Sequence, residues 1–184
     1  MADPIPQGMF LPHTVALKDG QTALIRQAQP EDAEALIGHA NEVGAEEIYI
    51  QTEKLDKTVE AEREWIAGFD GRSALLLVAL LGEKIVGVAD FERGPQVKNS
   101  HVAEVGIAIK KEARGQGIGR AMMKEWISWA RSIGVRKLFL GVFGTNDRAI
   151  ALYRSLGFVD EGRLRGQVVL RGEPADVVLM ALWL

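Results

Sequence analysis

Residues 107–120 read IAIKKEARGQGIGR, in which an apolar strand leads through a glycine-rich turn into an amphipathic helix. The turn has glycines at alternate positions, Gly115, Gly117 and Gly119. Because these residues have no Cβ atom, a ligand can approach the backbone closely. The first N–H groups of the helix have no partner within it, and the helix dipole places partial positive charge there. The segment therefore predicts a binding site for an anion, most naturally a phosphate group.

The charges and spacing of this turn narrow the choice of ligand. Arg114 and Arg120 add fixed positive charge on its two sides, which favours a pyrophosphate over a monophosphate. A dinucleotide-binding G-x-G-x-x-G fingerprint needs a glycine where Arg120 stands, and a Walker P-loop needs a Gly-Lys-Ser/Thr ending that is missing here. The pattern that fits is Arg-x-x-Gly-x-Gly, formed by Arg114, Gly117 and Gly119.

A second motif follows at residues 145–158, TNDRAIALYRSLGF. Asn146 suits the N-terminal cap of a helix, and Gly157 suits the left-handed residue that ends one. Asn146 and Tyr153 are seven residues apart, so both lie on nearly the same side of this helix. One helix face then presents an amide at its start and a phenol two turns later. The alternative is that Tyr153 is a core residue beside its apolar neighbours.

Together the two motifs resemble those of the GNAT superfamily of N-acetyltransferases. The resemblance extends over residues 22–184 and is closest over residues 104–158. It implies that the turn binds the pyrophosphate of acetyl-CoA through backbone amides and that the preceding strand pairs with the pantetheine arm. It further implies that Asn146 contacts this arm and that Tyr153 lies near the thioester sulfur. The implied cofactor-binding residues are Ile107, Ile109, Arg114, Gly115, Gln116, Gly117, Ile118, Gly119, Arg120, Asn146, Arg148 and Tyr153.

Periodicity along the chain predicts an α/β fold, with a mixed, largely antiparallel sheet of about seven strands and about four flanking helices. Asp19-Gly20 between two apolar runs indicates a hairpin. The helix expected at residues 117–132 has an apolar stripe that includes Trp126 and Trp129, which we place in the core rather than against a ligand. We expect one domain over residues 1–184, with residues 1–13 as a loose extension.

Composition excludes several classes of function. The net charge of −3 provides no basic surface for general nucleic-acid binding. The chain has no cysteine, so it has no disulfide, thiolate metal site or cysteine nucleophile, and we expect no metal. The longest apolar run, residues 74–81, is too short to cross a bilayer. We expect a cytoplasmic protein without nucleic-acid or membrane partners, and a homodimer is left open.

Acetyl transfer to an amine needs a neutral amine, a polarised thioester carbonyl and a protonated leaving thiolate. Without a cysteine, direct attack in a ternary complex is the simpler route. Backbone N–H groups near Ile107 can polarise the carbonyl. Tyr153 can serve as the acid that protonates the thiolate.

The catalytic base has two candidates. Glu104 shares a strand face with the small residues Gly106 and Ala108, which leaves room for a substrate, although a solvent-facing glutamate is the alternative. In the resembled family an acid on this strand often acts as the base, commonly through water. His101 is the rival, but strand alternation places it on the apolar face unless a bulge intervenes. The two remaining histidines, His13 and His39, are expected at the surface.

The acceptor is expected to be a primary amine, either of a small metabolite or at a protein N-terminus. Residues 44–57, which include Glu46, Glu47 and Tyr49, and the turn at residues 171–173 are free to form its pocket. The acidic and aromatic side chains of the first segment suit a cationic amine. Residues 162–180 resemble the branch of ribosomal-protein N-terminal and small-amine acetyltransferases. The alternatives are a transferase of longer acyl groups and a CoA-binding sensor without turnover.

Overall fold

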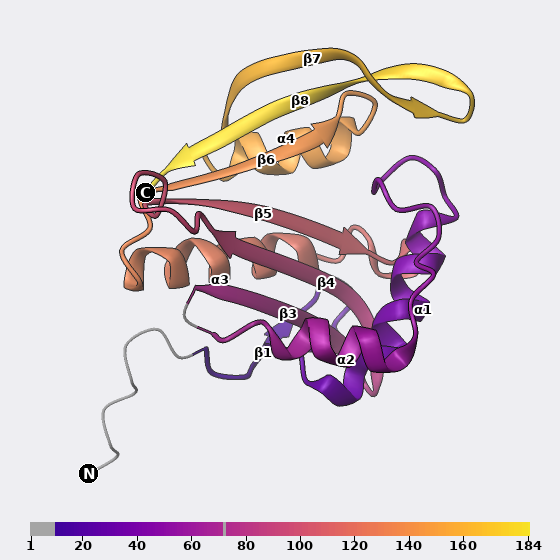
Figure 1. Cartoon of the computed structure of the whole chain (residues 1–184). Coiled ribbons are helices and arrows are strands. Elements are labelled where there is room, and N and C mark those ends of the chain that lie inside the picture. The colour runs from indigo at the N-terminus through magenta and orange to yellow at the C-terminus, as the bar shows by residue number, and fades with distance from the viewer. Residues whose placement is uncertain (1–9, 72) are drawn as a thin grey trace.

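A single mixed sheet with helices on both faces forms the structure, and the α/β prediction is confirmed (Figure 1). The computed structural model describes residues 10–71 and 73–184. The sheet has eight strands where about seven were expected. The strands are β1 (His13–Ala16), β2 (Thr22–Gln27), β3 (Ala74–Leu81), β4 (Lys84–Arg93), β5 (Val102–Ile109), β6 (Lys137–Phe143), β7 (Val159–Leu170) and β8 (Glu173–Trp183). The helices are α1 (Ala33–Gly44), α2 (Val59–Ala67), α3 (Ile118–Ser132) and α4 (Asp147–Ser155), with 3₁₀ turns at Pro30–Asp32 and Lys111–Ala113.

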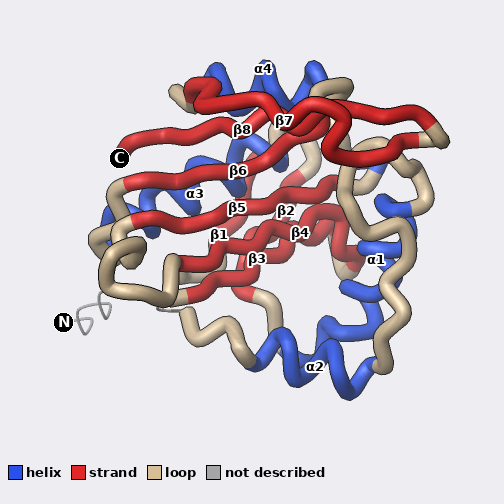
Figure 2. The backbone as a smooth tube through the Cα atoms, turned by 45° about the horizontal axis from the view of Figure 1, so that its top comes forward, coloured by secondary structure: helices blue, strands red, loops and turns tan. Residues whose placement is uncertain are grey.

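The strands lie side by side in one sheet (Figure 2) in the order β1-β2-β3-β4-β5-β6-β8-β7, which contains one parallel pair. β5 and β6 run parallel because α3 connects them across one face of the sheet. Their pairing spans only three residues on each strand, Val102–Glu104 with Lys137–Phe139. Beyond Glu104, β5 stays paired with β4 up to Ile109 but leaves β6. The sheet is therefore split along the second half of β5.

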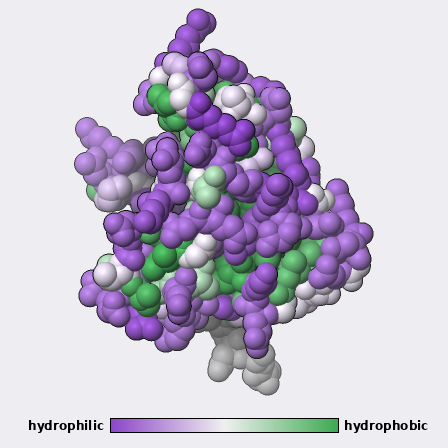
Figure 3. All heavy atoms as spheres, turned by 90° about the vertical axis from the view of Figure 1, so that its right-hand side faces the viewer, coloured by the Kyte–Doolittle hydropathy of each residue, from purple (hydrophilic) through white to green (hydrophobic). Residues whose placement is uncertain are grey.

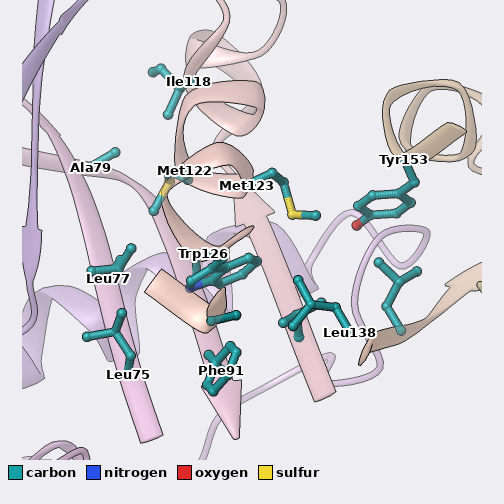
Figure 4. Packing of buried hydrophobic residues seen from close by; sticks show 14 of the residues in the cluster. Leu75, Leu77, Ala79, Phe91, Ile118, Met122, Met123, Trp126, Leu138 and Tyr153 are labelled. Carbon is teal, nitrogen blue, oxygen red and sulfur yellow. The ribbon is translucent and has the colours of Figure 1, made fainter. Parts of the chain in front are cut away.

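The main core lies between the sheet and α3. The apolar stripe predicted for this helix faces the strands, and Met122, Met123 and Trp126 are fully buried. Figure 4 shows these side chains beside those of the central strands, including Phe91 of β4. The Phe91 ring meets Trp129 edge to face, with ring centroids 4.7 Å apart. The prediction that both tryptophans of α3 are core residues is confirmed.

A second, smaller core lies on the opposite face of the sheet. There Leu36 of α1 and Ile66 of α2 pack on alternate residues of β3, such as Leu76 and Val78. The Thr58 hydroxyl starts α2 by accepting a hydrogen bond from the Ala61 N–H at 3.2 Å. These helices cover the β2–β4 part of this face and leave the β4–β5 part with its polar residues more open.

The N-terminal extension is only partly described. Its first nine residues lie outside the described part of the chain, whereas Phe10 packs against the main core. Strand β1 begins at His13, the last residue assigned to the extension. Within residues 10–71 and 73–184, no helix is long and apolar enough to span a membrane.

We predict that Trp126→Ala lowers the free energy of unfolding by about 3–5 kcal/mol, the usual cost of removing a fully buried tryptophan. Urea denaturation measures this change. Val97→Ala is the control, because Val97 is 93% exposed and its truncation should alter the free energy of unfolding by less than about 0.5 kcal/mol. A Trp126 variant as stable as this control would contradict the assignment of the core.

Candidate active site

A cavity of about 600 Å³ occupies the split between β5 and β6. One wall is formed by the free edge of β5, from Val105 to Ile109, and the other by Gly141–Phe143 of β6. The glycine-rich turn and the first residues of α3 close one end. Residues of α4 and of the segment after α1 also line the cavity, together with Lys18, Val43 and Val177. The cavity thus follows from the early end of the β5–β6 pairing.

The glycine-rich turn has a backbone that other residues adopt with difficulty. Gly115 and Gly117 have φ angles of 85° and 104°, in the left-handed region where a Cβ atom is strained. Gly117 is the N-cap of α3 and forms no side-chain cap, and the first turn of α3 has no acidic residue. The helix N-terminus therefore presents its N–H groups and partial positive charge without a competing carboxylate. This is the geometry expected of an anion site.

The three arginines near this turn are placed differently. Arg148 of α4 lies over Gly115, with Nη2 3.1 Å from the position of a Cβ atom there. Arg120 lines the cavity, and its Nη2 donates to the Ser155 hydroxyl at 2.5 Å. The Arg114 guanidinium turns toward the segment after α1, where it pairs with Glu46. Of the three, only Arg114 forms an ion pair with a carboxylate in the described part of the chain, so Arg120 and Arg148 keep their positive charge available to the cavity.

The second motif forms α4 as predicted. The Asn146 side-chain oxygen caps this helix by accepting from the Ala149 N–H at 3.1 Å, and Gly157 ends the segment with a φ of 95°. Asn146 and Tyr153 both line the cavity. Tyr153 is only 6% exposed, and its ring extends from α4 toward the sheet (Figure 4). The two motifs therefore meet at one cavity.

Comparisons with known proteins identify this architecture. The sequence profile of the acetyltransferase (GNAT) family matches residues 44–158, which contain both motifs. The chain belongs to the GNAT family. An L-amino acid N-acetyltransferase of Escherichia coli is 29% identical, over 86% of this chain and 96% of the relative.

Two solved structures extend the comparison. A ribosomal-protein-alanine N-acetyltransferase from Brucella melitensis is 30% identical with a TM-score of 0.78, covering 87% of this chain and 99% of that one. A phosphinothricin acetyltransferase from Sinorhizobium meliloti, solved in complex with acetyl-CoA, is 23% identical with a TM-score of 0.80, covering 88% of each chain. The relatives thus include the ribosomal-protein and small-amine acetyltransferases that residues 162–180 resemble.

The GNAT cavity contains most of the residues singled out from the sequence. All predicted cofactor-binding residues line it except Gln116, whose backbone oxygen instead accepts from the Lys18 N–H at 3.2 Å. Glu104 is exposed and lies on the half of β5 that is still paired with β6, outside the cavity lining. Its neighbours on the same strand face, Gly106 and Ala108, do line the cavity.

A carboxylate that sequence reasoning missed lies next to the cavity. Asp90 of β4 faces Gly106 across the strand pair, and its Oδ1 is 2.8 Å from where a Cβ atom of Gly106 would be. The glycine therefore makes the space that the carboxylate fills. Burial, followed by the charges of Glu92 and Glu104, raises the pKa of Asp90 to about 7. Only the β4–β5 register reveals this pairing, because Asp90 has no motif of its own.

The charge of Asp90 acts on Tyr153. The pKa of Tyr153 is raised to about 12, first by burial of the phenol and then by the Asp90 charge. The hydroxyl therefore stays protonated at neutral pH and remains a hydrogen-bond donor in the cavity. The raised pKa makes Tyr153 a weaker acid than an ordinary tyrosine, and the part of the increase that comes from the Asp90 charge is present only while Asp90 is ionised.

The histidines lie away from the cavity lining. His101 precedes β5, and the β4–β5 register runs from Ala103 to Ile109 without the bulge that would have favoured it as the base. The prediction that His39 is superficial is wrong: it is 2% exposed. Burial, together with the charge of Lys110, lowers its pKa to about 4. His39 lies on the buried side of α1, for which the sequence pattern had predicted apolar residues alone.

We predict that Tyr153 titrates well above an ordinary tyrosine. The chain has two tyrosines, so Tyr49→Phe leaves Tyr153 as the single phenol. Its phenolate absorbance should appear with a midpoint near pH 12 in the folded protein. The same variant unfolded in guanidinium chloride is the control and should titrate near 10. A midpoint near 10 in the folded variant would mean that the phenol is solvated.

Proposed function

We propose that this protein transfers the acetyl group of acetyl-CoA to a primary amine by direct attack in a ternary complex. The observation that supports this most is the split between β5 and β6, which has an anion site at one end and a buried phenol beside its middle. A thioester cofactor needs this combination of a diphosphate site, a free strand edge and a proton donor near the sulfur. The alternatives remain a longer acyl-CoA and binding without turnover.

The residues of the site fit the cofactor. The left-handed Gly115 and Gly117 let the backbone approach a diphosphate, and the α3 N-terminus supplies unpaired N–H groups. Arg120 and Arg148 add positive charge on the same cavity. The β5 edge from Val105 to Ile109 has backbone groups that β6 leaves unpaired, and these can bind the amide groups of the pantetheine arm.

The phenol of Tyr153 is assigned the role of proton donor to the leaving sulfur. It is buried, protonated at neutral pH and placed on the helix that faces the free edge of β5. Its pKa falls when the Asp90 charge is neutralised, because that charge is one of the two causes of its increase. Proton uptake by Asp90 would therefore make Tyr153 a better acid at the stage at which the thiolate leaves.

Two carboxylates on the open face of β4 and β5 are candidates for the base. Glu104 is the residue chosen from the sequence, and the geometry favours Asp90 over it because Asp90 adjoins the cavity-lining Gly106. A base with a pKa near neutrality can accept a proton from an ammonium group and release it to solvent. In the proposed reaction the ammonium group of the acceptor loses one proton to this base and becomes a neutral amine. The amine nitrogen then attacks the thioester carbon, and the C–S bond breaks as Tyr153 protonates the sulfur. The nitrogen's second proton then restores the phenol.

The acceptor is proposed to be the amino group of a small molecule such as an amino acid, or the α-amine of a peptide. This follows the relatives that act on L-amino acids and on ribosomal-protein alanine. Tyr49, Ile50 and Gln51, in the segment after α1, line the cavity, which supports assigning this segment to the acceptor side.

The proposed function predicts that CoA is released from acetyl-CoA when the right amine is present. A panel of amino acids, short peptides, polyamines and aminoglycosides, assayed with a thiol reagent, tests this. With the best amine, Tyr153→Phe should lower kcat by about 10²-fold or more, the usual contribution of a general acid, and leave acetyl-CoA affinity nearly unchanged. Turnover of alcohols or thiols alone would refute the amine assignment. Tight acetyl-CoA binding without any turnover would favour a sensor, and a preference for longer acyl groups would favour the other alternative.

The two candidate bases predict different pH profiles. If Asp90 accepts the proton, kcat/KM rises with pH through about 7 as Asp90 ionises. Asp90→Asn should then remove this limb. Glu104→Gln, the matched control, should keep the limb and move it to lower pH, because the Glu104 charge helps to raise the pKa of Asp90. The reverse result would assign the base to Glu104.

Asp90→Asn should also change stability in a pH-dependent way. The folded protein binds this proton more tightly than the unfolded chain, so the wild-type loses stability as the pH rises from about 4 to about 7. The variant lacks this cost, and its gain in Tm should therefore be larger at pH 8 than at pH 5. A pH-independent change in Tm would show that Asp90 has an ordinary pKa.

A further inference from the structure

The segment that follows α1 forms part of the cavity wall. This segment, residues 45–57, is called the α1–α2 loop below, and its residues Tyr49, Ile50 and Gln51 line the cavity. It lies on the right in Figure 1, on the face that Figure 3 shows to be largely hydrophilic with apolar residues between the polar ones. The loop lacks regular helix or strand, so its position depends on contacts with other elements.

One arginine from the cofactor turn contacts the first part of the loop at both Glu46 and Tyr49. The Arg114 Nη1 donates to a Glu46 carboxylate oxygen at 2.8 Å, and Nη2 donates to the other oxygen. The guanidinium carbon lies 4.1 Å from the centre of the Tyr49 ring. Arg114 Nε meanwhile donates to the Ile109 carbonyl at 2.8 Å, which fixes the side chain to the end of β5. The guanidinium is thus engaged along both edges and on one face.

This ion pair differs from a typical surface pair. The Arg114 and Glu46 side chains are only 13% and 24% exposed, and their geometry is bidentate. Arginine and carboxylate bind strongly in this fork-to-fork arrangement. The interaction also lowers the pKa of Glu46, chiefly through the hydrogen bond from Arg114. The carboxylate and the Tyr49 ring face are therefore occupied by Arg114 and are not free for a cationic amine, as the sequence alone had suggested.

Two further contacts hold the end of α1 and the start of the α1–α2 loop. Arg171, in the turn between β7 and β8, donates to the Glu46 carbonyl at 3.2 Å, and both views show this turn near the loop (Figures 1 and 2). Glu42 lies in α1, four residues before Glu46. Its carboxylate accepts a hydrogen bond at 2.5 Å from Lys110, the residue that follows β5. The end of α1 and the loop are thus tied twice to the connection that leads into the cofactor turn.

We propose that Arg114 is a positioning residue that fixes the α1–α2 loop to the cofactor turn, with Glu46 as its partner, and that its side chain does not bind the diphosphate. The proposal rests on the proposed function, because it assigns the loop to the acceptor side of that cavity. It leaves the charge on the diphosphate to Arg120, Arg148 and the α3 N-terminus. Through this contact, the order of the acceptor wall depends on the position of the turn that binds the cofactor.

The experiment compares Glu46→Gln with Glu47→Gln in the full chain without any ligand. Both variants remove one negative charge from adjacent residues, but Glu47 is exposed and outside the ion pair. Hydrogen exchange over residues 45–57 and trypsin cleavage at the exposed Lys54 report the order of the loop. We expect Glu46→Gln to increase both rates by about 5-fold or more, as for loss of a partly buried ion pair, and Glu47→Gln to match the wild-type. Equal rates in all three proteins would overturn the proposal.

Arg114→Gln and the double variant separate positioning from ligand binding. Arg114→Gln should loosen the loop as Glu46→Gln does, and the double variant should add little, because the two residues act as one pair. Calorimetry should show acetyl-CoA affinity reduced by less than about 3-fold in Arg114→Gln but by about 10-fold or more in Arg148→Gln, where a charge on the diphosphate is lost. A large loss of affinity in Arg114→Gln with an unchanged loop would make Arg114 a phosphate ligand.

The proposal and the proposed function fail in different ways. If the wild-type did not bind acetyl-CoA, the proposed function would fall, while the exchange measurements without ligand would still decide whether Arg114 fixes the loop. Once an acceptor is found, Glu46→Gln should raise the KM for the amine and leave the KM for acetyl-CoA nearly unchanged. An unchanged KM for the amine would show that the α1–α2 loop does not contribute to binding of the acceptor.

Discussion

The early end of the β5–β6 pairing is the constraint on which the rest of the site depends. Two parallel strands that stayed paired along their length would satisfy each other's backbone groups and leave no space between them. Here pairing stops after Glu104, and β5 continues to Ile109 with one free edge. The cavity, the exposed strand edge and the access of Tyr153 from α4 all follow from this separation.

Beside this separation, a buried phenol comes under the influence of a carboxylate's charge. Asp90 lies on β4 and Tyr153 on α4, and the charge of Asp90 adds to the burial that raises the pKa of Tyr153. Burial keeps both protonated more readily than they would be in water, since a charge is costly where solvent is excluded. In the proposed reaction, a proton taken up by Asp90 removes its negative charge and thereby lowers the pKa of Tyr153 at the stage at which the thiolate leaves.

Local signals account for the features that the sequence predicted well. The glycine turn, the cap and terminal glycine of α4, and the apolar stripe of α3 each depend on residues close together in the chain. The structure confirms them with little change. Asp90, by contrast, gains its meaning from Gly106, which the sequence cannot show to be its neighbour. His39 was expected at the surface for a similar reason, because its burial depends on what packs over α1.

The sequence by itself thus determined the family, the α/β architecture and the glycine-rich turn before α3, because these depend on spacing and periodicity within short segments. The tertiary structure decided which charged groups meet. It placed Glu104 outside the cavity lining and Asp90 beside it, and it paired Arg114 with Glu46, 68 positions away along the chain. Electrostatic interactions depend on distance in space and on exclusion of water, and both are set only when strands pair in one register and loops pack against them.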